Sequence, residues 1–72
     1  MIKIVFSGPY WKDNFDKIKY LMPKFNLKSK SNEARRTILV DGDNKLACDA
    51  LVNSVCVGGI EETEVTTEEV NQ

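Results

Sequence analysis

The stretch LKSKSNEARRTILV, residues 27–40, decides how the rest of the chain can be arranged. It begins with a weak, polar candidate strand at residues 27–31 and ends with an apolar one at residues 37–40. The connector between them, residues 32–36, is charged and only five residues long. Adjacent parallel strands need a crossover of about a dozen residues or more, so this connector favours an antiparallel hairpin.

The apolar strands favour the opposite arrangement. Residues 2–6 (IKIVF) and 37–40 (TILV) are β-branched and aromatic runs without regular polar alternation. Strands that are buried on both faces have this composition, which is typical of the centre of a parallel sheet. From these residues alone, an open parallel α/β sheet and an antiparallel, ferredoxin-like α+β sheet fit about equally well.

Two helices alternate with these strands. Helical spacing of apolar residues predicts the first helix from Asp13 or Asn14, either of which can cap it, to Met22, just before Pro23. The second predicted helix spans residues 44–54, and Asp43 is its predicted N-cap residue. Its apolar stripe consists of Leu46, Ala47, Ala50 and Leu51.

The last part of the chain is acidic. Residues 55–60 read as a turn that leads into a final short strand. Residues 61–72 carry five glutamates, and Thr66 or Thr67 with the residues that follow has the pattern of a capped helix start that the chain does not complete. The predicted order is therefore strand, helix, strand, strand, helix, strand, followed by the beginning of a third helix.

Composition restricts the classes of function. The 72 residues fit one domain, and their net charge of −1 hides a segregation, because residues 1–36 carry nine Lys or Arg and three acids whereas residues 37–72 carry one Lys and eight acids. Such segregation can steer an anionic partner to one face, or the two halves can neutralise each other across the fold. No apolar run is long enough to span a bilayer and no basic-then-apolar leader is present, so an intracellular location, in cytoplasm, nucleoid or nucleus, is expected.

Catalytic and metal-binding chemistry have few candidates. The chain has no histidine, no Cys-x-x-Cys pair and no phosphate-cradling Gly-Lys-Ser/Thr loop. Cys48 and Cys56 lack the partners that a zinc site would need, and they are interpreted as free thiols in a reducing compartment. We therefore expect no enzyme activity, no cofactor and no metal.

Several short motifs, in this order and spacing, resemble a BRCT domain, the module of NAD-dependent DNA ligases and of many replication and repair proteins. The resemblance covers residues 1–70 as one domain and leaves residues 71–72 as the C-terminal end. Its motifs are VFSG (5–8), KFNLKSKS (24–31), TILVDG (37–42), NKLA with Ala50 (44–50), Gly59-Ile60, and VTTEE (65–69). The glycine pair usual after the first helix of the family is missing.

The resemblance implies an open, four-stranded parallel sheet with the first and third strands adjacent and the two helices on opposite faces. It also implies a third helix that is cut short here. Apolar sheet surface would then stay uncovered, which predicts self-association through that face, with a dimer or larger assembly at micromolar concentration.

The family's phosphate site is carried over onto Ser7, Gly8 and Lys45. In the family a Ser or Thr hydroxyl and the next glycine N–H follow the first strand, and a lysine starts the second helix. Glycine permits close approach of a ligand to the backbone, and helix N-termini attract anions. Lys12 and Lys17 are possible accessory basic groups, although such lysines also fit a solvated helix face.

A purely structural interpretation of these residues remains open. Ser7-Gly8-Pro9 is ordinary turn chemistry, and Asp41 or Asp43 could pair with Lys45. We accordingly expect a non-catalytic binding module of DNA replication or repair that recognises a phosphorylated DNA end or a phosphoprotein. The alternative is a protein-interaction or self-association module without phosphate binding, for instance a small viral accessory protein that sequesters a host factor.

Overall fold

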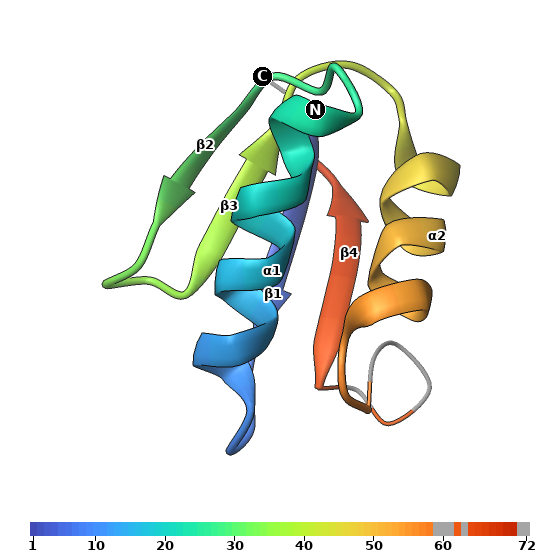
Figure 1. The fold of residues 1–72 in the computed structure, drawn as a ribbon. Coiled ribbons are helices and arrows are strands. Elements are labelled where there is room, and N and C mark those ends of the chain that lie inside the picture. Colours follow the sequence, from blue (N-terminus) through green and yellow to red (C-terminus); the bar gives the residue numbers. More distant parts are fainter. Residues whose placement is uncertain (59–61, 63, 71–72) are drawn as a thin grey trace.

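The computed structural model describes residues 1–58, 62 and 64–70. Four strands and two helices follow one another in the order β-α-β-β-α-β (Figure 1). Their bounds are β1 Ile2–Phe6, α1 Trp11–Lys24, β2 Ser29–Asn32, β3 Thr37–Val40, α2 Lys45–Val55 and β4 Val65–Glu69. The order of elements agrees with the sequence prediction, except that the last segment is a strand and not a helix.

The sheet is antiparallel throughout, with strand order β2-β3-β1-β4. β1 lies between β3 and β4, pairing Ile4 with Ile38 on one side and with Thr67 on the other. The predicted parallel α/β sheet is therefore wrong, and the fold is a small α+β unit with the strand order of the ferredoxin-like arrangement. The connector provides the reason, because β2 and β3 form a hairpin that pairs Asn32 with Thr37 and turns through Arg36 at φ 55°.

Both helices lie on the same face of the sheet, which corrects the expectation that they lie on opposite faces (Figure 1). In β1 the side chains of Ile2, Ile4 and Phe6 are fully buried beneath the helices. The alternate residues Lys3 and Val5 face the open side and are half-buried. The apolar character that suggested two covered faces comes from Val5 and, in β3, Leu39. The two are diagonal neighbours on the open face, since Val5 lies opposite Thr37 and Leu39 opposite Lys3.

One hydrophobic core fills the space between the helices and the sheet. Three of the core residues belong to β1 and one, Val65, belongs to β4. The others come from β3, α1 and α2. Phe6 and Phe15 meet edge to face with ring centroids 5.5 Å apart, which joins β1 to α1. The core consists of Ile2, Ile4, Phe6, Phe15, Ile18, Met22, Ile38, Val40, Cys48, Val52 and Val65.

Helix α1 extends beyond both of its predicted ends. It begins at Trp11, and Tyr10 occupies the cap position without a side-chain hydrogen bond, so neither predicted cap residue caps it. Pro23 lies inside the last turn, and Phe25 N–H still donates to the carbonyls of Leu21 and Met22. A proline so close to the end removes only one hydrogen bond of the ladder, which explains why the helix does not stop at Met22. No helix in the described part of the chain has the length and apolarity needed to cross a membrane.

The predicted start of a third helix, residues 66–70, lies largely in β4. Val65 to Glu69 pair with β1 along its whole length, and Val70 N–H donates to the carbonyl of Met1 over 2.8 Å. The threonines that suggested a helix cap have high β-propensity and fit this edge position. Gly59-Ile60, where the fourth strand was expected, lie outside the described residues.

Asn14 ties the start of α1 to the segment that follows α2. Among the described residues it is the one fully buried polar side chain. Its amide donates to the carbonyl of Val57 over 3.1 Å and accepts from the N–H of Val57 over 2.9 Å. Both polar atoms of a buried amide are thus satisfied by one backbone residue 43 positions away.

This pair of hydrogen bonds predicts a large effect of Asn14→Ala. We expect the free energy of unfolding to fall by about 1–3 kcal/mol, because two hydrogen bonds are lost and a cavity remains. The matched control is Asn53→Ala on the exposed side of α2, which should change stability by no more than about 0.5 kcal/mol. Urea titrations followed by circular dichroism measure both, and equal effects of the two substitutions would contradict the interpretation of Asn14.

Candidate functional site

The three residues of the predicted phosphate site do not come together. Ser7 and Gly8 follow β1, whose end is paired with the start of β3, since Val5 lies opposite Thr37. Lys45 starts α2 after the other end of β3, where Val40 lies opposite Ile2. In a parallel sheet the ends of β1 and β3 would meet at one edge, whereas antiparallel pairing places them at opposite ends of the sheet (Figure 1).

The turn at Ser7 and Gly8 faces a carboxylate. The N–H and the hydroxyl of Ser7 both donate to the carbonyl of Glu64, over 2.8 and 3.3 Å. Gly8 has φ 82°, and a Cβ at this position would collide with the carboxylate of Glu64. The positive φ of the turn favours glycine here, whereas the carboxylate stands at the end of a flexible side chain that could move aside. A negative side chain in the place where a phosphate would bind disfavours an anion there.

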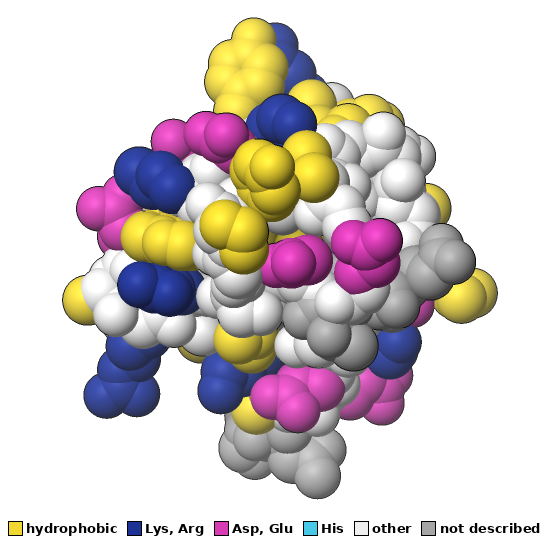
Figure 2. All heavy atoms as spheres, turned by 90° about the horizontal axis from the view of Figure 1, so that it is seen from below, with side chains coloured by type: hydrophobic (Ala, Val, Ile, Leu, Met, Phe, Trp, Pro, Cys, Tyr) yellow, Lys and Arg dark blue, Asp and Glu magenta, His cyan; other side chains and the backbone are white. Residues whose placement is uncertain are grey.

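The three predicted basic groups have partners within the fold. Lys45 Nζ lies 2.9 Å from Asp49 of the same helix, and neither Asp41 nor Asp43 takes that place. Lys12 pairs with Asp16 at 3.1 Å and also with Glu33, which raises its pKa. Figure 2 shows the end of the molecule that lies at the bottom of Figure 1, where basic and acidic side chains are mixed and do not form one basic patch.

Lys17 contacts the carboxyl end of the second helix. Its Nζ donates to the carbonyl of Val55 over 3.2 Å. A cation at the C-terminal end of a helix interacts favourably with the helix dipole. The structural role of Lys17 is therefore to hold α1 against α2, beside the hydrogen bonds of Asn14.

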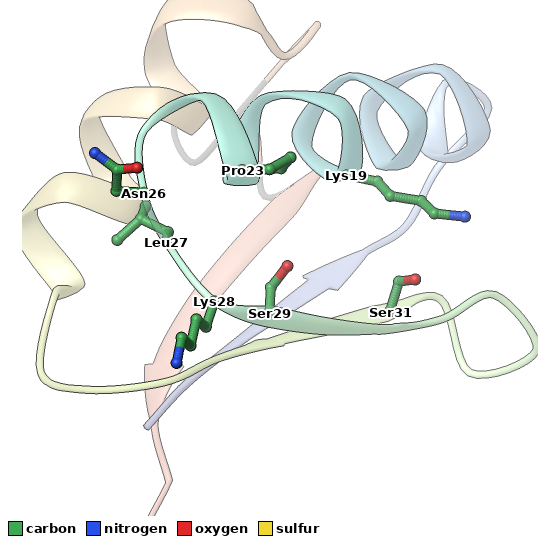
Figure 3. Close-up of a pocket in the computed structure, with 7 residues that line it drawn as sticks. All are labelled: Lys19, Pro23, Asn26, Leu27, Lys28, Ser29 and Ser31. Atoms are coloured by element: carbon green, nitrogen blue, oxygen red, sulfur yellow. The ribbon is translucent and has the colours of Figure 1, made fainter.

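Three of the surface hollows formed by the described residues are candidates for binding. The first, about 700 Å³, lies between α1 and β2 and is lined by Lys19, Pro23, Asn26, Leu27, Lys28, Ser29 and Ser31 (Figure 3). The hydroxyls of Ser29 and Ser31 point up from β2 towards the helix, whereas the amines of Lys19 and Lys28 point away from each other. These groups do not converge on one point, so the hollow lacks the arrangement that would hold a small anion.

The second hollow lies on the open face of the sheet. It measures about 590 Å³ and has Val5 and Leu39 at its centre, with Lys3, Lys30 and Arg35 among the groups around them. A sheet that binds single-stranded nucleic acid stacks bases on aromatic side chains. No aromatic residue belongs to the lining of this hollow, which consists of Lys3, Val5, Lys30, Ser31, Asn32, Arg35, Thr37, Leu39 and Val70.

The third hollow is an apolar groove between the two helices, which we call the helix groove. It measures about 480 Å³ and is lined by Leu21, Phe25, Leu27, Ala47, Ala50, Leu51, Ser54 and Val55. Seven of these eight side chains are apolar. Phe25 is 57% exposed, and Leu46, which lies one turn before Ala50 on the same side of α2, is 86% exposed.

Part of the helix groove is built from the apolar stripe that the sequence predicts for α2, and most of that stripe is exposed. The predicted apolar stripe of α2 includes Leu46, Ala47 and Ala50, which are exposed, whereas the buried residues of this helix are Cys48 and Val52. The signal that could have shown this is the width of the stripe. Apolar residues surround most of α2, more than one sheet-facing side requires.

Neither cysteine is placed for catalysis. Both thiols are free; Cys48 is fully buried and Cys56 is half-buried. Burial raises the pKa of Cys48, and it raises that of Cys56 to about 11 although Lys17 acts in the opposite direction. Since the thiolate is the nucleophile, the raised pKa values disfavour the reactive form of both thiols at neutral pH. Among the residues that the structure describes, no three His, Cys, Asp or Glu side chains gather into a group that could hold a metal ion.

Comparisons of the chain with protein-family models, with curated proteins and with solved structures found no match. They therefore neither support nor rule out the resemblance to BRCT domains. Of the three hollows, the helix groove is the one in which side chains of a single chemical kind converge.

The network around Asp49 predicts a pH dependence. Burial acts to raise the pKa of Asp49, but hydrogen bonds from Thr67 and Lys45 outweigh it, so the pKa lies below its ordinary value. The stability that this carboxylate provides is present above its unfolded pKa and is lost as pH falls through the lower folded pKa.

We therefore expect the free energy of unfolding of the natural chain to fall more steeply than that of Asp49→Asn as pH is lowered from about 6 to about 3. Thermal unfolding at each pH measures the difference. Asp43→Asn, at an 89% exposed side chain, is the control and should keep the slope of the natural chain. Identical slopes for the natural chain and Asp49→Asn would show that the Thr67–Asp49–Lys45 network does not act.

Proposed function

We propose that this chain is a non-catalytic protein-interaction module that binds an apolar segment of a partner in the helix groove. The observation that carries the proposal is the exposure of Phe25 and Leu46 beside a groove that is apolar over nearly all its lining. Contiguous apolar surface rimmed by polar residues is typical of interaction sites in soluble proteins.

The shape of the groove suits the apolar side of a helix. Leu21 and Leu51, from α1 and α2, are half-buried and form its base, whereas Ala47 and Ala50 form a low wall on α2. Small side chains on this wall allow a third helix to approach closely, and Phe25 offers a large aromatic anchor at one end. Helix-in-groove recognition uses such anchors at positions i, i+3, i+4 and i+7 of the bound segment.

The charges at the rim add a preference for acidic partners. Lys17 and Lys24 are exposed and lie two turns apart on α1, so they share the side that faces the groove. The sequence of α2 contains one acid, Asp49, which points to Thr67 of β4 and away from the groove. An amphipathic helix with glutamates on its polar face would therefore meet attraction from both lysines.

Binding of a phosphorylated DNA end or a phosphoprotein lacks this kind of support. That expectation, and the role in DNA replication or repair, came with the resemblance and with a site of Ser7, Gly8 and Lys45. Because antiparallel pairing separates Lys45 from the other two residues, we favour the alternative of a protein-interaction module without phosphate binding.

A model ligand tests the helix groove directly. The probe is a synthetic amphipathic helical peptide with leucines at positions i, i+3, i+4 and i+7 and glutamates on the polar face. We expect its binding to shift the amide NMR signals of groove residues, and Ala50→Lys to weaken it at least about tenfold, since a charged side chain would replace an apolar wall.

The matched control is Asn53→Lys, which adds the same charge at an exposed residue of α2 that does not line the groove. It should change the affinity by less than about twofold, because it replaces no apolar wall and a surface charge acts only weakly in salt. Equal loss of binding in both variants would contradict the proposal, because the added lysine attracts the acidic peptide and only Ala50→Lys changes the groove lining. Shifts confined to the open face of the sheet would overturn the proposal.

A further inference from the structure

The sheet ends at two strands, β2 and β4, and each has one side that pairs with no other strand among the described residues. We propose that copies of this chain associate head to tail, with the β2 edge of one copy pairing with the β4 edge of the next. This association is separate from the helix groove, because it uses the two sheet edges.

The first support is the direction of the backbone groups. Asp41 N–H donates to the carbonyl of Lys28. In an antiparallel pair of strands, hydrogen-bonded residue pairs alternate with pairs that are not hydrogen-bonded. Two residues further along, Lys30 and Leu39 therefore form the next hydrogen-bonded pair of β2 and β3. The residues between them, Ser29 and Ser31, therefore direct their N–H and C=O groups away from β3, towards the open edge.

The same reasoning applies to β4. Ser7 N–H donates to the carbonyl of Glu64, and Val70 N–H donates to the carbonyl of Met1. These bonds show which residues of β4 are hydrogen-bonded to β1, namely every second one. Thr67 and Glu69 are the residues between them, so they direct their backbone groups away from β1. Each edge thus offers alternate residues with donors and acceptors, as strand addition requires.

The second support is charge. Lys30 lies in β2 and Lys28 directly precedes it, whereas Glu68 and Glu69 end β4. Two β2 edges or two β4 edges would bring like charges together, which is how natural edge strands avoid pairing with themselves. The combination of β2 with β4 brings opposite charges together. Lys30 and Glu68 both lie on the open face, since they pair with Leu39 and Lys3, so they are on the same side of the joined sheet.

The third support is strand direction. Each strand is antiparallel to its neighbour in the order β2-β3-β1-β4, so β2 and β4 run in opposite directions. A copy displaced sideways would therefore place its β4 antiparallel to β2 and continue the sheet. The hollow between α1 and β2 leaves room beside α1 on the helix side of β2 (Figure 3). In the joined sheet α2 of the next copy would approach this room, because α2 lies over β4 and accepts a hydrogen bond from it through Asp49.

Such an interface uses two different surfaces and does not close on itself, so it produces open chains. We expect the natural protein to show an average mass that rises above 8.2 kDa as its concentration approaches about 1 mM, and that falls again when salt is added. Sedimentation equilibrium measures this, and a monomer throughout the range would overturn the proposal.

Two proline variants identify the edges. Ser29→Pro blocks the β2 edge and Glu69→Pro blocks the β4 edge, and neither removes a hydrogen bond of the sheet because both N–H groups point outward. Each variant alone should be monomeric. An equimolar mixture should give a 1:1 heterodimer and nothing larger, since each variant keeps the edge that the other lacks. A monomeric mixture would overturn the proposal, and so would association of either variant as strong as that of the natural chain.

A charge exchange gives a second test that does not depend on proline. Lys30→Glu and Glu68→Lys should each associate at least about fivefold more weakly than the natural chain, and mixing them should restore part of the loss. Ala50→Lys, which blocks the helix groove, should associate like the natural chain. If Ala50→Lys alone abolishes association, self-association runs through the groove and the edges are not the interface, while binding of the helical peptide still decides the proposed function.

Discussion

The pairing of β1 with a strand on each side determines the rest of the structure. Because β3 and β4 are both antiparallel to β1, the turn after β1 and the start of α2 lie at opposite ends of the sheet. The same pairing puts Ile2, Ile4 and Phe6 on one face, and both helices cover that face. It also leaves β2 and β4 at the edges. The separated phosphate residues, the helix groove and the open edges all follow from this one arrangement.

The positions of most elements could be predicted from sequence, but their directions could not. Residues 2–6 and 37–40 are strands as predicted, because short β-branched runs have few alternatives. The error came from Val5 and Leu39, whose apolar side chains were interpreted as evidence of a second covered face. The connector of residues 32–36 carried the correct information, because its length is a geometric limit whereas composition is only a preference.

The candidate site was harder to predict than the fold. From sequence alone, lysines that bind an anion cannot be distinguished from lysines that pair within the fold, and this applies to positions 12, 17 and 45. The difference lies in residues that are distant in the chain, such as Glu33 beside Lys12 and the carbonyl of Val55 beside Lys17. For the helix groove, the sequence shows the apolar residues of α2. It does not show that α2 packs against one other helix and that several of these residues therefore stay exposed.

Charge segregation along the chain becomes segregation across the sheet. The basic N-terminal half supplies β2 and α1, and the acidic C-terminal half supplies β4, with the ion pairs of Lys3 to Glu68 and of the N-terminal amine to Asp43 joining the halves. These pairs are long, at 3.9 and 4.0 Å, and exposed, so each contributes little to stability. The segregation therefore matters more for what each edge of the sheet presents, a lysine on β2 and glutamates on β4.

The burial of Cys48 makes its thiol a probe of local opening of the fold. A thiol reagent reacts with a thiolate that it can reach, and this side chain offers neither the ionised form nor an exposed sulfur. Its labelling can then proceed only through rare openings in which α2 lifts from the sheet. The rate of thiol modification would therefore report how often this opening occurs, as hydrogen exchange does for backbone amides. A residue with no part in recognition thus reports how often the helix that forms one wall of the groove leaves its place.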